Sequence, residues 1–451
     1  MTKDFTSGSP FKQIFFFSLP FLIGNLFQQF YNIVDTIIVG RVMNADALAA
    51  VGSTGGIIWF FCGFICCLAP GFSAFVSQCF GAHRPEKVKH AFGMSIILSA
   101  IICVILTIIS CTCAMPILKF LRTPYENDII YMAHDYVIWV FAAIPGTMLF
   151  NLLSNIIRAL GDSKNPLYFL IASCVINIIL DILLVPILGT AGAGLATALA
   201  QLSSGIMCVI YIVKKQPALH IKRRHLRLNG FIIMQLLRIG IPMGLLNIIL
   251  SLGSIATQFA SNTLGNVYMA SQTAATKIEQ FVTQPLIAIG NASMVFTAQN
   301  YGAKKYDRII KGTKITQLIG LTWCAILTVI MLLFGKFFLS LVVGPDETEI
   351  INNGFTYIII NTICCFIVSP LIICKAFLQS LGRVTAPIIS GPLEIVGRAI
   401  ASIGALIIFK DPIMQYLGVC LSNPIAWALG LIPLLIDYII KIKNFKNLMF
   451  K

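Results

Sequence analysis

Apolar stretches long enough to cross a lipid bilayer recur along the whole chain. Of its 451 residues, 58% are hydrophobic and only 11% are charged, whereas soluble proteins carry roughly 25% charged residues. A helix needs about 20 consecutive apolar residues to span the hydrocarbon core. The chain offers twelve such stretches, at approximately 12–39, 48–78, 90–115, 130–157, 166–187, 191–213, 232–263, 268–298, 314–342, 352–380, 385–409 and 418–440. The sequence therefore predicts an all-α polytopic membrane protein with twelve transmembrane helices.

The two halves of the chain repeat each other at an offset of about 221 residues, which indicates a duplicated structural unit. Gln78 corresponds to Gln299, and Pro20 corresponds to Pro242. The first six spans therefore pair with the last six, as two pseudo-symmetric six-helix bundles. Repeats of this kind often enclose a substrate path, so the pattern favours a transporter. The predicted domains are an N-terminal six-helix bundle (1–214), a cytoplasmic basic linker (215–229) and a C-terminal six-helix bundle (230–451).

The formal net charge of +15 is typical of nucleic-acid-binding proteins, but the distribution of the basic residues indicates another cause. Most Lys and Arg residues lie in the interhelical segments that share one side of the membrane with the N-terminus. This bias predicts that both termini are cytoplasmic. The acidic loop around Asp346, Glu347 and Glu349 then falls outside. We therefore expect a multi-pass protein of the cell (inner or plasma) membrane, with no nucleic-acid partner.

Polar residues form stripes on several spans, at steps of three and four that place them on one helix face. Such a face is costly against lipid, so it lines a wet cavity or pairs with a neighbouring helix. Both interpretations stay open for the Asn, Gln and Ser residues. The predicted substrate-cavity residues are Asn25, Gln29, Asn32, Asn247, Ser254, Gln258, Gln280 and Gln284.

Two aspartates, Asp35 in the first span and Asp181 in the fifth, lie deep within apolar sequence. An aspartate at the centre of a membrane helix costs roughly 2.5–3.5 kcal/mol, which favours a functional role over a structural one. At the repeat offset, Asp35 corresponds to Thr257 and Asp181 corresponds to Ser402. Only the first half of the chain therefore presents paired carboxylates.

Other charged and sulfur-containing residues receive structural interpretations. Glu394 and Arg398 lie four residues apart on one helix and are predicted to form an ion pair. Glu279 and Lys277 are predicted to be solvated near the outer end of the eighth span. The 14 Cys residues lack the paired spacing with His that metal sites show, so buried thiols are favoured over metal ligands or disulfides.

Taken in order, short motifs along essentially the whole chain resemble those of the multidrug and toxic compound extrusion (MATE) transporters. The resemblance is greatest to the bacterial branch, whose cation site lies in the N-terminal bundle. The motifs of the first half are Pro20, Tyr31, Val34-Asp35-Thr36, Gly40, Leu48-Ala49-Ala50-Val51, Ser77-Gln78, Gly81-Ala82, Arg158-Ala159-Leu160-Gly161-Asp162, Asn177, Asp181 and Gly194-Leu195-Ala196-Thr197. Those of the second half are Gln299-Asn300-Tyr301-Gly302-Ala303, Leu381-Gly382-Arg383, Glu394, Arg398 and Asn423-Pro424-Ile425-Ala426-Trp427.

The resemblance implies a V-shaped pair of bundles that works by alternating access as a monomer. It implies export of amphipathic, often cationic compounds in exchange for Na⁺ or H⁺, with no cofactor besides this coupling ion. The implied cation site, which is a metal site if the ion is Na⁺, consists of Asp35, Asn177, Asp181 and Thr197. Other members carry a Glu just after the Pro of the seventh helix. Here residues 247–251 contain no acid, which argues against a cation site in the second bundle.

Two alternatives stay open beside drug efflux. A lipid-linked oligosaccharide flippase of the same superfamily would suit a cationic cavity, whereas the stripes here carry Asp and neutral amides. An intramembrane enzyme belongs to a different class, but the five His residues form no convincing catalytic set, and we predict no catalytic residues. The sequence contains no Gly-rich loop ending in Gly-Lys-Ser or Gly-Lys-Thr for ATP. Secondary active transport is therefore the main prediction.

Overall fold

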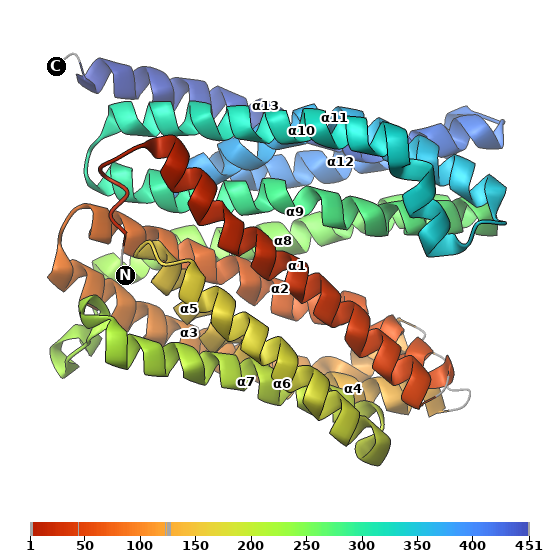
Figure 1. The fold of residues 1–451 in the computed structure, drawn as a ribbon, viewed down its shortest axis with the longest axis horizontal. Helices are drawn as coiled ribbons and strands as arrows, with labels where there is room; N and C mark the ends of the chain where they lie inside the picture. Colours follow the sequence, from red (N-terminus) through yellow and green to blue (C-terminus); the bar gives the residue numbers. More distant parts are fainter. Residues whose placement is uncertain (1–2, 44, 122, 124–127, 450–451) are drawn as a thin grey trace. The chain divides into compact units, whose positions relative to one another are not determined.

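The computed structural model describes residues 3–43, 45–121, 123 and 128–449, and nearly all of them are helical (Figure 1). Within this part of the chain, eleven helices are long and apolar enough to cross a membrane, and a bent pair makes up to twelve spans. The predicted all-α fold with twelve spans is therefore confirmed. The helices are α1 (Pro10–Val42), α2 (Ala45–Gly81), α3 (Pro85–Phe120), α4 (Ile129–Ala142), α5 (Ile144–Ala159), α6 (Lys164–Leu188), α7 (Thr190–Lys215), α8 (Gly230–Leu264), α9 (Asn266–Gly302), α10 (Tyr306–Val343), α11 (Thr348–Ser380), α12 (Thr385–Ile408) and α13 (Pro412–Met449), with short 3₁₀ helices η2 (Pro217–Leu219) and η3 (Arg223–Leu226) between α7 and α8.

The bent pair is the fourth span, which the sequence predicts as one helix. α4 and α5 meet at an angle of 43°. Pro145 lies in the first turn of α5, where its missing N–H is tolerated, although it would disrupt a continuous helix. The break therefore falls at Ala143, directly between the two helices.

The contacts of the chain divide it into two compact units. The first unit comprises residues 3–4 and 23–244, and the second comprises 5–22 and 245–449. This assignment differs from the predicted domains, because the start of α8 packs with the first unit. A Cβ placed on Gly71 of α2 would lie 2.6 Å from the Cα of Gly240, so the two helix backbones approach closely where neither residue has a side chain.

Both helices that pass from one unit to the other do so just beyond a proline. α1 changes unit after Leu22, two residues past Pro20, and α8 changes unit after Gly244, two residues past Pro242. A proline within a helix removes one backbone hydrogen bond and weakens the helix locally. The repeat therefore places equivalent weak points at the two places where a helix leaves one unit for the other.

The N-terminal segment is fixed within the second unit by a basic side chain. Arg308 of α10 donates hydrogen bonds to the backbone carbonyls of Phe5 (2.9 Å), Ser7 (3.2 Å) and Gly8 (2.8 Å). The Phe5 ring is buried and packs edge-on against Phe17 at a centroid distance of 4.8 Å. These contacts explain why residues 5–22 belong with the second unit.

Close packing also organises the remaining helices of each unit. In the first unit, Ser173 of α6 donates to the backbone carbonyl of Ala200 on α7 (2.7 Å), which fixes these two helices against each other. In the second unit, α12 and α13 pack side by side (Figure 1). A Cβ on Gly397 would lie 2.8 Å from the Cα of Ala426, so small residues allow this approach as well.

Candidate functional site

The four residues of the predicted cation site come from three helices of the first unit. α1 supplies Asp35, α6 supplies Asn177 and Asp181 one turn apart, and α7 supplies Thr197. Asp35 is 8% exposed, Asn177 1% and Asp181 0%. The structure therefore places all four in one unit and buries both carboxyl groups.

Hydrogen bonds connect these residues directly. With its amide oriented to satisfy its neighbours, Asn177 donates to Oδ2 of Asp181 (2.9 Å), and its carbonyl accepts from the backbone N–H of Thr197 (3.3 Å). The carboxyl groups of Asp35 and Asp181 share a hydrogen bond. Because an ionised carboxylate only accepts hydrogen bonds, this arrangement requires a proton on one of the two groups.

Two carboxyl oxygens in this cluster are left without a partner. Oδ1 of Asp35 and Oδ1 of Asp181 are both buried, and neither has a hydrogen-bond donor among the described residues. A buried charge is costly unless it is paired. The cluster thus suits a bound cation: hard oxygen ligands match Na⁺, and either carboxylate can instead carry a proton. Within the described part of the chain, no group of three or more His, Cys, Asp or Glu side chains forms a metal site.

Two tyrosines complete the cluster, and neither is among the predicted site residues. The Tyr31 hydroxyl lies 3.2 Å from the Thr197 hydroxyl. Tyr136 of α4 is 8% exposed and lies in the vicinity of both aspartates. Tyr31 could have been included on its spacing, because it precedes Asp35 by one helical turn. Nothing in the sequence around Tyr136 marks it.

The second unit contains a different buried polar network, in which carboxylates are paired. Glu394 accepts from Lys375 (3.3 Å) and lies 3.9 Å from Arg398, which confirms the predicted ion pair. Arg398 donates to the Asn423 side chain (3.2 Å), whose amide donates to the Tyr357 hydroxyl (3.1 Å). This network is already charge-compensated, unlike the aspartate pair of the first unit.

The prediction that Glu279 is solvated at an outer interface is wrong. The side chain is half-buried and accepts a hydrogen bond from the Tyr357 hydroxyl at 3.3 Å. It lies 13 residues into α9, which starts at Asn266, and a helix rises about 1.5 Å per residue. Glu279 is therefore about 20 Å from the helix start, too deep for an interface position.

The positions that correspond to the two aspartates carry only hydroxyl groups. Thr257 donates to the Ser422 hydroxyl (3.4 Å), and Ser402 donates to the backbone carbonyl of Arg398 (2.6 Å). Neither residue brings a charge. The asymmetry between the halves that the sequence predicts is therefore present in the side chains of the two units.

The predicted substrate-cavity residues divide between the two units. In the first unit Asn25 and Gln29 are half-buried, and the side chain of Asn32 lies outside the described residues. Those of the second unit are half-buried or exposed: Asn247, Ser254, Gln258, Gln280 and Gln284. The side-chain amide nitrogen of Asn247 is nevertheless buried, and it has no hydrogen-bond partner among the described residues. The role of all these residues in substrate binding stays a prediction.

Comparison with known proteins agrees with this architecture. The sequence model of the MatE family matches residues 20–183 and 242–393. The chain is 26% identical to the probable multidrug resistance protein YoeA of Bacillus subtilis (strain 168), over 96% of this chain and 94% of YoeA. It is 25% identical to the multidrug export protein MepA of Staphylococcus haemolyticus (strain JCSC1435), over 67% of each chain. Its fold matches a crystal structure of MATE in complex with MaL6 with a TM-score of 0.90, at 20% identity, over 99% of this chain and 100% of that one.

Proposed function

Since the chain belongs to the MatE family, we propose that it is a multidrug efflux antiporter that exports amphipathic, often cationic compounds in exchange for Na⁺ or H⁺. The proposed mechanism is secondary active transport by alternating access. Support for the substrate class comes from the multidrug resistance and multidrug export proteins to which the chain is similar. Support for the coupling comes from the aspartate pair of the first unit.

The observation that carries the proposal is the hydrogen-bonded pair of Asp35 and Asp181. Two carboxylates in contact cannot both be ionised without a compensating positive charge. The pair can hold either a proton or, with the oxygens of Asn177 and Thr197, a Na⁺ ion. Release of that cation leaves two repelling negative charges in an apolar bundle. This repulsion favours a conformational change after which the pair binds another cation. An exchanger requires such a link between cation binding and conformation.

The energy available from one cation is sufficient for drug export. Entry of one elementary charge down about 100 mV releases about 2.3 kcal/mol, and a tenfold concentration gradient adds about 1.4 kcal/mol. Together these sustain a gradient of a few hundredfold for a neutral substrate. Coupling to a single Na⁺ or H⁺ is therefore enough, and ATP is not required.

The proposal also includes the membrane placement. Lys and Arg are concentrated in the interhelical segments on the same side of the membrane as the N-terminus, which supports a cytoplasmic location for both termini. The similarity to bacterial proteins supports a location in the plasma membrane. In this orientation α1 enters from the cytoplasm, and Asp35 lies about 37 Å along it, in its outer half. The coupling ion then reaches the aspartate pair from either side as the transporter alternates.

Transport by the purified full chain in proteoliposomes tests the proposal. A cationic fluorescent dye such as ethidium is followed while a Na⁺ gradient or a pH gradient is imposed separately, with the membrane potential clamped. We expect uphill movement of the dye under one of the two gradients. Dye binding without uphill movement under either gradient would contradict an exchange mechanism.

A further inference from the structure

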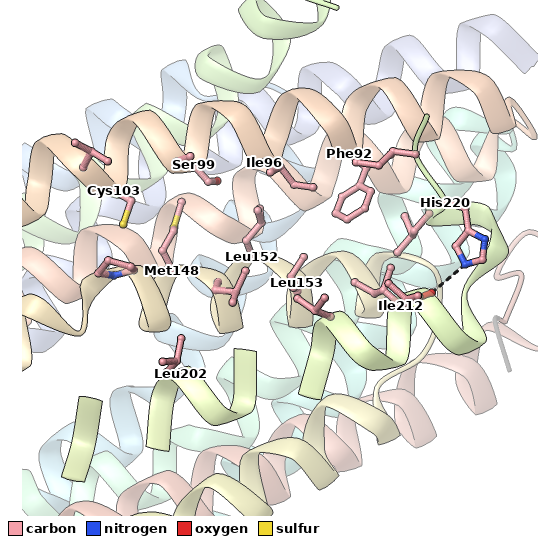
Figure 2. Close-up of a pocket in the computed structure, with 18 residues that line it drawn as sticks. Phe92, Ile96, Ser99, Cys103, Met148, Leu152, Leu153, Leu202, Ile212 and His220 are labelled. Carbon is pink, nitrogen blue, oxygen red and sulfur yellow. Dashed lines mark hydrogen bonds between the residues drawn. The ribbon is translucent and has the colours of Figure 1, made fainter. Parts of the chain in front are cut away.

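A deep apolar groove runs along the first unit, away from the aspartate pair. It encloses about 800 Å³, a volume typical of pockets that bind whole small ligands. α3, α5 and α7 form its walls, through side chains such as Ile96, Leu152 and Leu202 (Figure 2). Ser99 adds a hydroxyl that has no hydrogen-bond partner among the described residues and is 4% exposed. The lining therefore suits an apolar ligand.

The length and depth of the groove match one leaflet of a bilayer. Along α3 it extends from Phe92 to Val104, a distance of about 18 Å at about 1.5 Å per residue. One leaflet contributes half of a hydrocarbon core of about 30 Å. Phe92 lies near the start of α3, so the groove runs from one membrane surface toward the midplane. A single acyl chain fits this path.

The segment between α7 and α8 lines the groove at its end near the membrane surface, which we call the mouth. Leu219, His220 and Ile221 line this end, and His220 is placed by a contact of 3.3 Å between its Nε2 and the backbone carbonyl of Ile212 (Figure 2). The sequence suggests a linker here, yet the segment folds into η2 and η3, and both pack on α3. The mouth therefore has a folded segment on one side, which we call the floor.

An ion-pair cluster holds this floor against α3. Glu86, in the first turn of α3, accepts from Arg224 (2.7 Å) and lies 3.1 Å from Nε2 of His225. His225 is fully buried, and its Nδ1 accepts from the backbone N–H of Lys222 at 2.9 Å. Lys222 is thereby held directly beside the groove residue Ile221.

Four basic residues next to these lining residues in the sequence have no carboxylate partner in the described part of the chain. All four are exposed, and among the described residues no carboxylate oxygen lies within 4.0 Å of their nitrogens: Lys214, Lys215, Lys222 and Arg223. Lys214 directly follows the lining residue Val213. Basic pockets at the cytoplasmic surface of membrane helices are suited to anionic headgroups. The charge thus complements a phosphate at the point where an acyl chain would leave the groove.

We propose that this groove binds an anionic phospholipid of the cytoplasmic leaflet, with one acyl chain between α3, α5 and α7 and its phosphate against Lys214, Lys222 and Arg223. The orientation follows from the distribution of basic residues along the chain. The site does not include the aspartate pair, and lipid binding does not require that the chain exports drugs. A bound lipid would join the floor to α3, α5 and α7 within the first unit.

Native mass spectrometry of the full chain tests this proposal. The protein is equilibrated in nanodiscs that contain equal amounts of phosphatidylglycerol and phosphatidylcholine with identical acyl chains, then released, and the retained lipid is identified. We expect retained phosphatidylglycerol to exceed phosphatidylcholine by about fivefold for each basic side chain that contacts the headgroup. Equal retention of the two lipids, or retention of neither, would overturn the proposal.

Two variants separate the groove from the basic mouth. Ala100→Trp fills the groove and should abolish retention of both lipids, whereas Ile101→Trp, at an exposed neighbouring residue outside the groove, should not. The triple variant Lys214→Gln, Lys222→Gln, Arg223→Gln should keep one bound lipid and lose the preference for phosphatidylglycerol. The same charge change at Lys304, Lys311 and Lys314 of the second unit should leave the preference intact.

Each opposite outcome contradicts a specific part of the proposal. Unchanged retention in Ala100→Trp would show that the lipid binds elsewhere on the surface. Equal loss of preference in both triple variants would show that the protein attracts anionic lipid only through its overall charge. Displacement of the lipid by a transported dye at micromolar concentration would assign the groove to drugs instead. If Ala100→Trp does not fold, the two triple variants still decide the headgroup site.

Discussion

Asp35 of α1 and Asp181 of α6 share a hydrogen bond inside an apolar bundle, and each keeps one buried oxygen without a donor. A structural polar contact in a membrane protein normally satisfies both partners, as Glu394 is satisfied by Lys375 and Ser390 in the second unit. The aspartate pair is left incomplete until a cation or proton binds. That difference supports the proposal that the first unit handles the coupling ion.

Replacement of either aspartate by asparagine should abolish coupled efflux. Asp35→Asn and Asp181→Asn remove the charge that attracts the cation but keep the size of the side chain. Folding should be unaffected or improved, because a buried charge is costly in the bilayer. Gradient-driven dye efflux in proteoliposomes should fall by at least ~10-fold at equal protein content, the loss that corresponds to about 1.4 kcal/mol. Wild-type efflux in either variant would remove the pair from the mechanism.

The neutral ligands should tune affinity without being essential. Asn177→Ala removes a hydrogen bond to a carboxylate, an interaction worth about 1.5–3 kcal/mol, so the apparent cation affinity should weaken by about 10-fold or more. Thr197→Ala should have a smaller effect in the same direction. The matched controls are Thr257→Ala and Ser402→Ala, which lie in the second unit and should leave this affinity nearly unchanged. A large shift from either control would show that the second unit also binds the coupling ion.

The prolines at the two unit changes should differ in importance. Pro20→Ala and Pro242→Ala each restore a backbone N–H and should stiffen the helix. Because only α1 carries a carboxylate beyond its proline, Pro20→Ala should slow transport more than Pro242→Ala. Pro116→Ala, within α3 and away from both unit changes, serves as the control. Initial rates of dye efflux measure the order. Equal rates in all three variants would mean that the prolines at the unit changes have no special role in transport.

The charged network of the second unit should contribute stability. Glu394→Gln leaves Lys375 and Arg398 without their carboxylate in a poorly solvated position, and removal of one partner of a buried pair costs about 3–5 kcal/mol. Asp437→Asn breaks the more exposed pair with Arg383, a contact of 3.2 Å, where a surface pair is worth about 0–1 kcal/mol. Thermal unfolding in detergent should therefore show a clearly lower melting temperature for Glu394→Gln alone. Equal shifts would indicate that the network is solvated.

Hydropathy predicts the spans of this protein well but not where its helices end. α13 extends to Met449, beyond the predicted span 418–440, and hydropathy misses its last turns because they are polar. The floor formed by η2 and η3 could not be predicted either, since the pairing of Glu86 with Arg224 and His225 has no local sequence pattern. Hydrophobic length is a local property, whereas these features depend on tertiary contacts.

The site shows the same division between local and tertiary information. Asp35 and Asp181 could be identified because an acid in apolar sequence is costly wherever the helices pack. Tyr136 could not, because a tyrosine in a membrane helix is ordinary and only the packing of α4 brings it to the pair. Glu279 was misplaced for a related reason: its bond to Tyr357 joins α9 to α11, a pairing without a sequence signal.

Direct measurement of cation binding tests the central claim most sharply. Purified protein in detergent is titrated with ²²Na⁺ at several pH values, and proton uptake is followed in parallel with a pH indicator. We expect a cation, Na⁺ or H⁺, to bind to the wild type and to Thr257→Ala, and this binding to be lost in both Asp35→Asn and Asp181→Asn. Cation binding that persists unchanged in both aspartate variants would contradict the assignment of the coupling site to the first unit.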